Sequence, residues 1–306
     1  MKKKAAFVAV VGRPSAGKST LVNQICGEKV SIVSAVPQTT RNAIRGIINR
    51  EQGQLVFIDT PGRHKSEKKF NKKLTDISGR AVDDSDIMLY VVDASRLPGP
   101  EEAEVAALLA PRADRTIAAI NKIDIAGDNC GGIYEFLGQA LPGMGRDRCF
   151  EVSAKDNIGI EALLAALYDI APEGEAFYSE EFYTDQEVEF RIAEIIREQA
   201  VNRLRQELPH ALYVEIADVE FNGKDTPREN EPRNSKLWVR AFIVVERESQ
   251  KGMVVGKGGT MIKAIRLAAL KELSNIFDWK IELDLRVKTG KDWRHNDRIL
   301  KRLTEG

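Results

Sequence analysis

The chain of 306 residues is long enough for two domains, because a single hydrophobic core seldom organises more than about 250 residues. Hydrophobic residues make up 43% and charged residues 30%, a balance that excludes a disordered or fibrous protein. Lysine plus arginine and aspartate plus glutamate each number 46, so the net charge of zero gives no overall attraction to nucleic acid or acidic lipid. Any surface that binds such polyanions must therefore be local.

The three cysteines, Cys26, Cys130 and Cys149, are spaced too widely for a metal-binding or redox pair, which is typical of a protein from a reducing compartment. The apolar run 5–11 is interrupted by the turn at residues 12–14 before it reaches the length of a signal peptide or a membrane span. We therefore expect a cytoplasmic protein, and any contact with the membrane would be peripheral, at its inner face.

Strand-length apolar runs alternate with amphipathic helical stretches as far as residue 170. These runs are residues 5–11, 55–58, 87–92, 117–120 and 149–152. The best-marked helix begins at Pro100, has the acidic residues Glu101 and Glu102 in its first turn and ends before Pro111. The alternation predicts an α/β domain over residues 1–170, with a largely parallel sheet flanked by helices.

The character of the sequence changes after residue 170. Residues 171–185 are acidic and aromatic without any period, so we predict a linker between two domains there. The rest of the chain, residues 186–306, predicts a smaller α+β domain with the order helix, strand, strand, helix, strand, helix. Its expected elements are a helix over 188–204, strands at 212–221 and 237–246, a helix ending near 273, a strand at 280–287 and a last helix from about 292.

Residues 12–19, Gly-Arg-Pro-Ser-Ala-Gly-Lys-Ser, match the phosphate-loop pattern G-x-x-x-x-G-K-[ST] and directly follow the first predicted strand. The backbone N–H groups of such a loop and the helix that follows it bind phosphate, while Lys18 adds a positive charge toward the outer phosphates. Ser19 is the expected ligand of Mg²⁺. The residues predicted to contact the nucleotide here are Gly12, Arg13, Pro14, Ser15, Ala16, Gly17, Lys18, Ser19 and Thr20.

A second nucleotide motif, Asp59-Thr60-Pro61-Gly62, follows the buried run 55–58. Its carboxylate stands at the carboxyl end of a strand, as the second coordination shell of Mg²⁺ requires. The N–H group of Gly62 can then meet a terminal phosphate. Such a sequence alone is also an ordinary turn, and the nucleotide interpretation depends on its pairing with the phosphate loop.

Asn121-Lys122-Ile123-Asp124 follows another apolar run and predicts which base is bound. The Asp124 carboxylate can accept hydrogen bonds from the N1–H and 2-amino groups of guanine, whereas adenine has neither donor, a difference worth on the order of 10⁴-fold in affinity. Ser153-Ala154-Lys155 can supply a backbone N–H to the guanine carbonyl. The residues predicted to bind the base are Asn121, Lys122, Asp124, Ser153, Ala154 and Lys155.

This ordered set of motifs resembles the signature of the Ras-like GTPases. Within that class, residues 38–41 (Gln-Thr-Thr-Arg), residues 59–64 and the second predicted domain closely resemble the bacterial Era family of ribosome-assembly GTPases over nearly the whole chain. The resemblance implies that Thr40 ligates Mg²⁺, with Ser19, when GTP is bound. It also implies that Lys18, Thr40 and Gly62 are the catalytic residues, and that Asp59 contacts the metal through its second shell.

Two positions depart from the patterns of these families. Arg63 stands where many switch GTPases have a glutamine that orients water and where Era-like enzymes have an aliphatic residue. Ser15 stands where the family typically has an asparagine associated with potassium-assisted hydrolysis. We therefore expect slow intrinsic hydrolysis without a strong dependence on potassium.

Residues 254–259, Val-Val-Gly-Lys-Gly-Gly, resemble the G-x-x-G loop of a KH domain, which binds about four nucleotides of single-stranded RNA. The helix–strand–strand–helix–strand order resembles a type II KH domain. Residues 251–273 include five basic residues and one acid, a local charge of +4. A glycine turn at a helix start and a solvated helix face would look similar. The predicted RNA-binding residues are Gly256, Lys257, Gly258, Gly259, Lys263 and Arg266.

The sequence thus predicts a P-loop GTPase domain followed by a smaller type II KH domain, with Mg²⁺ as cofactor and GTP or GDP as ligand. By resemblance, the partner is the 3′ end of 16S ribosomal RNA in the maturing small ribosomal subunit, and the chain acts as a monomer. One alternative is a phosphotransferase or ATPase that uses the same loop but has no role for Asp124. Another is a membrane-associated signalling GTPase whose second domain binds protein or lipid.

Overall fold

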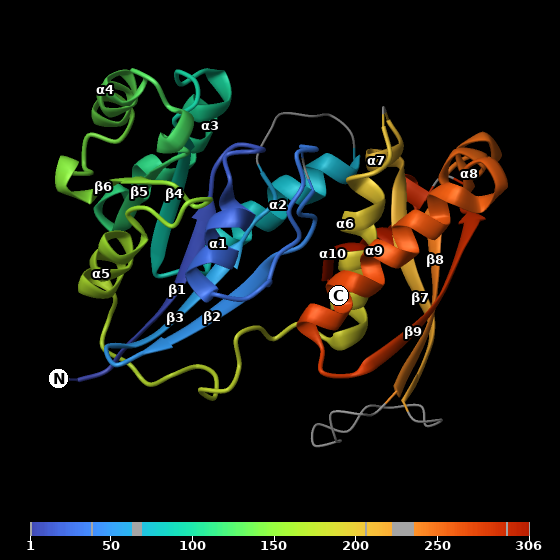
Figure 1. Cartoon of the computed structure of the whole chain (residues 1–306). Helices are drawn as coiled ribbons and strands as arrows, with labels where there is room; N and C mark the ends of the chain where they lie inside the picture. Colours follow the sequence, from blue (N-terminus) through green and yellow to red (C-terminus); the bar gives the residue numbers. More distant parts are fainter. Residues whose placement is uncertain are drawn as a thin grey trace. The chain divides into compact units, whose positions relative to one another are not determined.

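The computed structural model describes residues 2–37, 39–62, 69–205, 207–221, 236–291 and 293–305, without the side chains of 69–73, 295, 302, 304 and 305. The chain divides into two compact units (Figure 1), one built mainly from residues up to 185 and the other mainly from residues 186–300. Within the described residues, no helix has both the length and the apolar character needed to cross a membrane. Arg63 and Gln38 lie outside the described residues.

The first unit is built on a six-stranded sheet of order β2-β3-β1-β4-β5-β6. Its strands are β1 (Lys4–Val11), β2 (Ile44–Arg50), β3 (Gly53–Asp59), β4 (Ile87–Asp93), β5 (Thr116–Asn121) and β6 (Cys149–Val152). All pairs are parallel except β2 with β3. This confirms the predicted largely parallel sheet and adds β2, whose polar residues interrupt its apolar ones because it is an edge strand.

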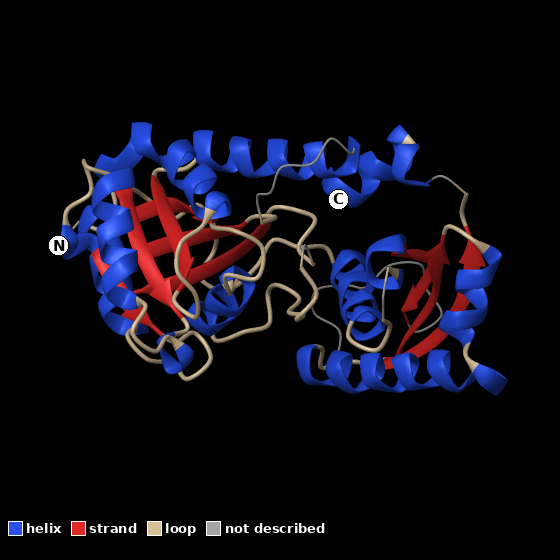
Figure 2. Ribbon diagram, turned by 90° about the horizontal axis from the view of Figure 1, so that it is seen from above, coloured by secondary structure: helices blue, strands red, loops and turns tan. Residues whose placement is uncertain are grey.

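Helices cover both faces of this sheet (Figure 2). They are α1 (Lys18–Cys26), α2 (Lys69–Asp83), α3 (Pro100–Leu109), α4 (Cys130–Ala140) and α5 (Ile160–Ile170). Val8 and Val10 share a core with α1 and α5, whereas Ala9 and Val11 share the opposite core with α2, α3 and α4. The helix predicted to begin at Pro100 is confirmed, with proline at its first position.

The predicted linker, residues 171–185, is hydrogen-bonded to the first unit. The Gln54 side chain accepts from the N–H groups of Phe177 and Tyr178 at 2.8 and 3.0 Å, and donates to the Tyr178 carbonyl at 2.8 Å. Further along, the N–H of Ile47 donates to the carbonyl of Tyr183 at 2.9 Å. The segment therefore covers the outer edge of β2, and it ends where the second unit begins.

The second unit has a three-stranded sheet of order β7-β8-β9. Its elements are α6 (Val188–Val201), α7 (Leu208–Ala211), β7 (Leu212–Phe221), β8 (Lys236–Val245), α8 (Glu248–Val255), α9 (Thr260–Ile276) and β9 (Lys280–Thr289). The last helix, α10 (Asp297–Glu305), belongs to this unit only as far as Leu300. β7 and β8 are antiparallel, while β8 and β9 are parallel. Helices α6, α8 and α9 share one core with the sheet.

Helix α8 was not predicted. Its sequence, Glu-Ser-Gln-Lys-Gly-Met-Val-Val, has a glycine at Gly252 and apolar residues only at its end, so it carries little helical periodicity. Its existence matters for the candidate RNA site, because the glycine loop at residues 256–259 lies between two helices, α8 and α9.

Candidate functional site

The predicted nucleotide motifs come together at the carboxyl ends of the parallel strands. The phosphate loop follows β1, Asp59 ends β3, Asn121 ends β5 and Ser153 follows β6. In open α/β sheets, ligands bind outside these strand ends. The sheet topology therefore brings four sequence segments, separated by up to about 140 residues, into one site.

The phosphate loop leads directly into α1. Helix α1 begins at Lys18, and the first turn of α1, all of whose residues are described, contains no acidic side chain. Its free N–H groups and helix dipole therefore favour an anion at this end. Lys18 is buried, and its ammonium group donates to the carbonyls of Gly12 and Arg13 at 3.1 and 3.0 Å. Burial lowers the pKa of Lys18 to about 8, although the nearby Asp59 carboxylate raises it.

The three predicted metal-site residues lie together. The Ser19 hydroxyl is 2.6 Å from Oδ2 of Asp59 and 2.9 Å from the Thr40 hydroxyl. Oδ1 of Asp59 is buried without a hydrogen-bond partner, and burial raises the pKa of this carboxyl group. Two hydroxyls and one carboxylate, one oxygen of which has no hydrogen-bond partner, are a donor set that fits Mg²⁺. Within the described ranges, no three or more His, Cys, Asp or Glu side chains form a cluster suited to a metal.

Gly62 lies against the phosphate loop. A Cβ atom at this position would come within 2.7 Å of the backbone of Pro14, so only glycine allows the approach. The preceding Thr60 is fixed by a hydrogen bond of 2.8 Å from its hydroxyl to the carbonyl of Val10. The segment after β3 is therefore held beside the loop, with the Gly62 backbone next to the expected place of the terminal phosphate.

The base-binding segments are linked to each other and to the phosphate loop. The Asn121 amide donates to the carbonyl of Ala16 and accepts from the N–H of Ala154, each at 3.0 Å. The Ser153 hydroxyl donates to Oδ1 of Asp124 at 2.8 Å. Asp124 is exposed, so its second carboxylate oxygen can accept hydrogen bonds from a base. These contacts give Asn121 a role in holding the loops together, and the exposed Asp124 remains the candidate for binding the base.

Arg13 was predicted to contact the nucleotide, but its side chain is buried and forms ion pairs with Asp93 and Glu102. The sequence analysis did not connect either carboxylate with the nucleotide site. Asp93 directly follows the apolar run 87–92. That is the position that Asp59 has after its own strand, so the pattern that indicated Asp59 could also have indicated Asp93.

The glycine loop of the second unit connects α8 to α9 in a backbone conformation that favours glycine. Gly256, Gly258 and Gly259 have φ angles of +74°, +61° and +78°. A Cβ atom at Gly258 would meet nothing within 4 Å, and the Lys257 side chain is exposed. The loop therefore offers open backbone and one lysine to a polyanion, as the KH resemblance requires.

Lys263 and Arg266, two of the predicted RNA-binding residues, have different surroundings on α9. Lys263 is exposed, but Arg266 is half-buried, and its Nε–H donates to the carbonyl of Leu283 on β9 at 2.6 Å. The sequence showed the helical spacing of Arg266 but not the strand beside it. Arg266 borders a cavity of about 460 Å³ between α9 and the edge of β9, which is lined by Trp238, Arg266, Glu282, Leu283, Asp284 and Leu285.

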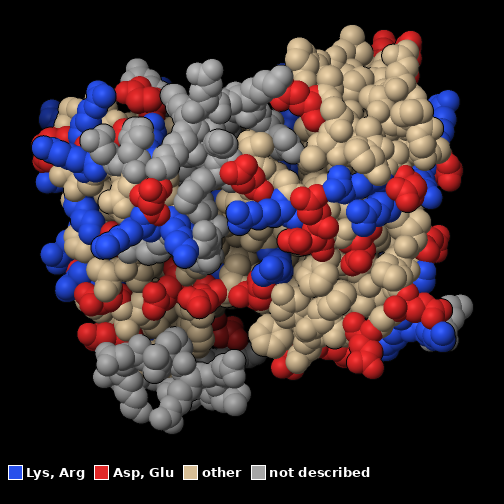
Figure 3. Space-filling view, turned by 180° about the vertical axis from the view of Figure 1, so that it is seen from behind, with Lys and Arg blue, Asp and Glu red and all other residues tan. Residues whose placement is uncertain are grey.

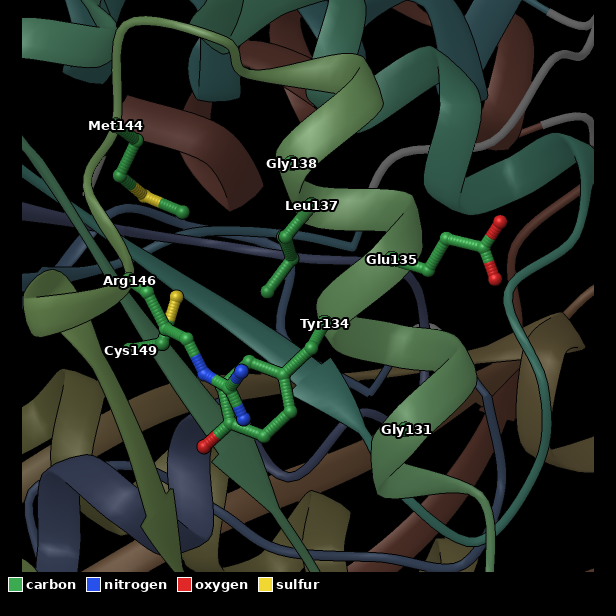
Figure 4. A pocket seen from close by; sticks show the side chains of 8 residues that line it. All are labelled: Gly131, Tyr134, Glu135, Leu137, Gly138, Met144, Arg146 and Cys149. Atoms are coloured by element: carbon green, nitrogen blue, oxygen red, sulfur yellow. The ribbon is translucent and has the colours of Figure 1, made fainter.

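Another cavity, of about 420 Å³, lies beside α4 and β6 (Figure 4). Its lining includes Tyr134, Met144, Arg146 and Cys149, and the Arg146 guanidinium lies 4.5 Å from the centre of the Tyr134 ring. None of the predicted nucleotide-binding residues lines this cavity.

On the face of the molecule shown in Figure 3, basic and acidic side chains lie interspersed, in keeping with the zero net charge.

Sequence comparisons match both units to known families. The profile of the family described as "50S ribosome-binding GTPase" matches residues 7–122, and the profile described as "KH domain" matches residues 207–294. GTPase Era of Treponema denticola is 50% identical over 299 residues, which cover 97% of this chain and 98% of that protein. GTPase Era of Borreliella burgdorferi is 41% identical over 300 residues, which cover 98% of this chain and 99% of that protein.

Two solved structures of Era proteins are similar to this structure over nearly the whole chain. A point variant of Aquifex aeolicus Era bound to GDP and aluminium fluoride has a TM-score of 0.88 and 31% identity, with 98% of both chains covered. Era in complex with MgGDPNP and nucleotides 1506–1542 of 16S ribosomal RNA has the same TM-score and coverage at 30% identity.

Proposed function

The chain belongs to the Era family of GTPases, and we propose that its GTP-hydrolysing domain controls the binding of its KH domain to the 3′ end of 16S ribosomal RNA during assembly of the small ribosomal subunit. The observation that carries this proposal is the match of 98% of both chains to an Era structure that holds MgGDPNP and a 16S RNA fragment. Both halves of that complex have a counterpart here, the strand-end nucleotide site and the glycine loop between α8 and α9.

At the nucleotide site, each group has a separate task. Lys18 and the N–H groups at the start of α1 bind the phosphates, and the Gly62 N–H stabilises charge on the terminal phosphate as water attacks it. Ser19 and Thr40 would ligate Mg²⁺ directly, and Asp59 would do so through water. When bound, the metal neutralises the charge that develops on the phosphate oxygens. Thr40 and Gly62 belong to segments that can respond to the loss of the γ-phosphate.

In the second unit, the glycine loop would lie against the sugar-phosphate backbone of RNA. Bases could then enter the cavity of about 460 Å³ between α9 and β9. The exposed Lys257 and Lys263 would pair with phosphates. The description of the matching nucleotide-domain family names the 50S subunit, but that profile covers only residues 7–122 and none of the RNA-binding unit. The 16S RNA complex, which covers both units, is the better guide to the partner.

Crosslinking in a cell extract tests the proposed partner. The tagged full chain is irradiated with ultraviolet light in extract, and the attached RNA is sequenced. We expect reads enriched at the 3′ end of 16S ribosomal RNA. The control is a variant with Lys257→Asp and Gly258→Asp, which should lose this enrichment. Equal recovery by both proteins, or no enrichment of that region, would reject the proposal.

The second candidate function, a membrane-associated signalling GTPase, gives a different result. Its KH-like unit would bind lipid or protein, and sedimentation with vesicles that contain acidic phospholipid would recover the chain without competition from RNA. Under the proposed function, added 16S fragment competes with any such binding, because both polyanions use the same basic residues.

A further inference from the structure

Asp93, the last residue of β4, holds a buried carboxylate between the phosphate loop and the base-binding segment. Its Oδ1 accepts from the N–H and hydroxyl groups of Ser95, at 2.9 and 2.6 Å. Its Oδ2 accepts from the guanidinium of Arg13 and, at 2.8 Å, from the ammonium of Lys122. One carboxylate oxygen therefore joins a cation of the phosphate loop to a cation of the base-binding segment.

Arg13, Asp93, Glu102 and Lys122 form a cluster of charged side chains, and its Arg13 end is closed to solvent. Arg13, Asp93 and Glu102 are each at most 5% exposed. The Nε–H of Arg13 donates to Glu102 at 2.8 Å, and Glu102 also accepts from the Tyr90 hydroxyl at 3.1 Å. Burial works against ionisation of Asp93, but the hydrogen bonds from Lys122 and Ser95 hold its pKa below the ordinary value. Asp93 is thus a charged group with a fixed orientation.

The same cluster supports two strained backbone positions. Ser15 and Lys122 have φ angles of +62° and +69°, which are uncommon for residues other than glycine. Such positions are energetically unfavourable and persist only where the surroundings hold them. The Lys122 ammonium donates to the carbonyl of Ser15 at 2.7 Å while it pairs with Asp93. The strain therefore lies at the point where the two nucleotide-binding segments meet.

We infer that Asp93 is a positioning residue for nucleotide binding, which holds Lys122 and Arg13 so that the phosphate loop and the base-binding segment form one preorganised site. Without the carboxylate, Lys122 loses its buried partner and the Ser15–Lys122 contact loses its support. Base and phosphate are then bound by segments that must first be ordered, so affinity falls. The inference rests on GTP binding at this site and is independent of the RNA partner.

Asp93→Asn is the direct test. An amide can retain the Ser95 contacts, but its NH₂ group then faces two cations and can accept from neither. We expect the Kd for a fluorescent GDP to rise at least about tenfold, because one partner of a buried charge pair is lost. Hydrolysis at saturating GTP should change much less, since the lost contact serves binding rather than the transition state. The matched control is Asp86→Asn, directly before the other end of β4. Its exposed carboxylate accepts a hydrogen bond from the N–H of Phe7 and from no other group among the described residues.

A double-mutant cycle separates positioning from a general loss of stability. If Asp93 acts through Lys122, then Asp93→Asn should cost at least about threefold less in affinity when Lys122→Met is already present. Additive losses, an unchanged Kd in Asp93→Asn or an equal loss in Asp86→Asn would each overturn the inference.

Ser95→Ala provides the test if Asp93→Asn does not fold. It removes the hydroxyl bond to Oδ1 but leaves every buried charge paired. A Kd raised about threefold at an unchanged melting temperature supports the inference, because a single hydrogen bond to a charged group is worth this much or more. An unchanged Kd contradicts it.

Discussion

Asp124→Asn is expected to change the preferred base from guanine to xanthine. The carboxylate of Asp124 can accept from both N1–H and the 2-amino group of guanine, whereas an amide presents an NH₂ donor that suits the C2 carbonyl of xanthine. The Ser153 hydroxyl, 2.8 Å from Oδ1, should hold the amide in the same place. Wild type should prefer GTP to ATP by roughly 10⁴-fold, and the variant should bind xanthosine triphosphate more tightly than GTP.

Competition against a fluorescent GDP gives the three binding constants. Asp128→Asn is the matched control, since it makes the same change on another exposed aspartate four residues further along the chain. It should leave the preference for GTP unaltered. A variant of Asp124 that still prefers GTP to xanthosine triphosphate would rule out the assignment of this residue to the base.

The double variant with Lys257→Asp and Gly258→Asp is expected to lose most of its affinity for single-stranded RNA that copies the 3′ end of 16S ribosomal RNA. It places two negative charges where the RNA backbone must approach. It also adds a side chain at Gly258, where close contact between the loop and the RNA requires that no side chain be present. A Cβ atom at Gly258 meets open space, and aspartate tolerates a positive φ better than most residues. The melting temperature and the affinity for GTP should therefore change little.

A charge-matched control is available at the far end of the same helix. Lys271→Asp with Asn275→Asp changes the net charge by the same amount at exposed positions of α9, away from the glycine loop. Fluorescence anisotropy at one fixed salt concentration compares the three proteins. If both double variants lost the same affinity, the effect would be one of overall charge, and the glycine loop would have no particular role.

The parts of the fold that could be predicted were those in which local pattern and burial agree. The apolar runs 87–92 and 117–120 belong to central strands covered on both faces, so their residues carry an unbroken signal. β2 has only a partial signal, because an edge strand mixes apolar and polar residues. α8 was missed for a related reason, since a short helix with a glycine depends on packing against α9 rather than on its own sequence.

In the candidate site too, some features could be predicted from local sequence and others depend on the tertiary fold. The positions of Lys18, Asp59 and Asp124 at one edge of the sheet could be predicted, because each belongs to a short motif that follows a predicted strand. The contacts of the Arg13 and Arg266 side chains could not be predicted, because their partners lie 80 and 17 residues away and depend on the tertiary fold. The sequence shows that such residues are cationic, but it does not show which carboxylate or carbonyl group they contact.

Whether the bound nucleotide governs RNA binding by this chain is tested most directly by one measurement. The Kd of the full chain for the 16S 3′-end oligonucleotide is determined with GDP and with a non-hydrolysable GTP analogue, at the same salt concentration. We expect the two values to differ at least about fivefold, and the oligonucleotide to change the affinity for the analogue relative to GDP by the same factor. Equal affinity for the oligonucleotide in both nucleotide states would contradict this account.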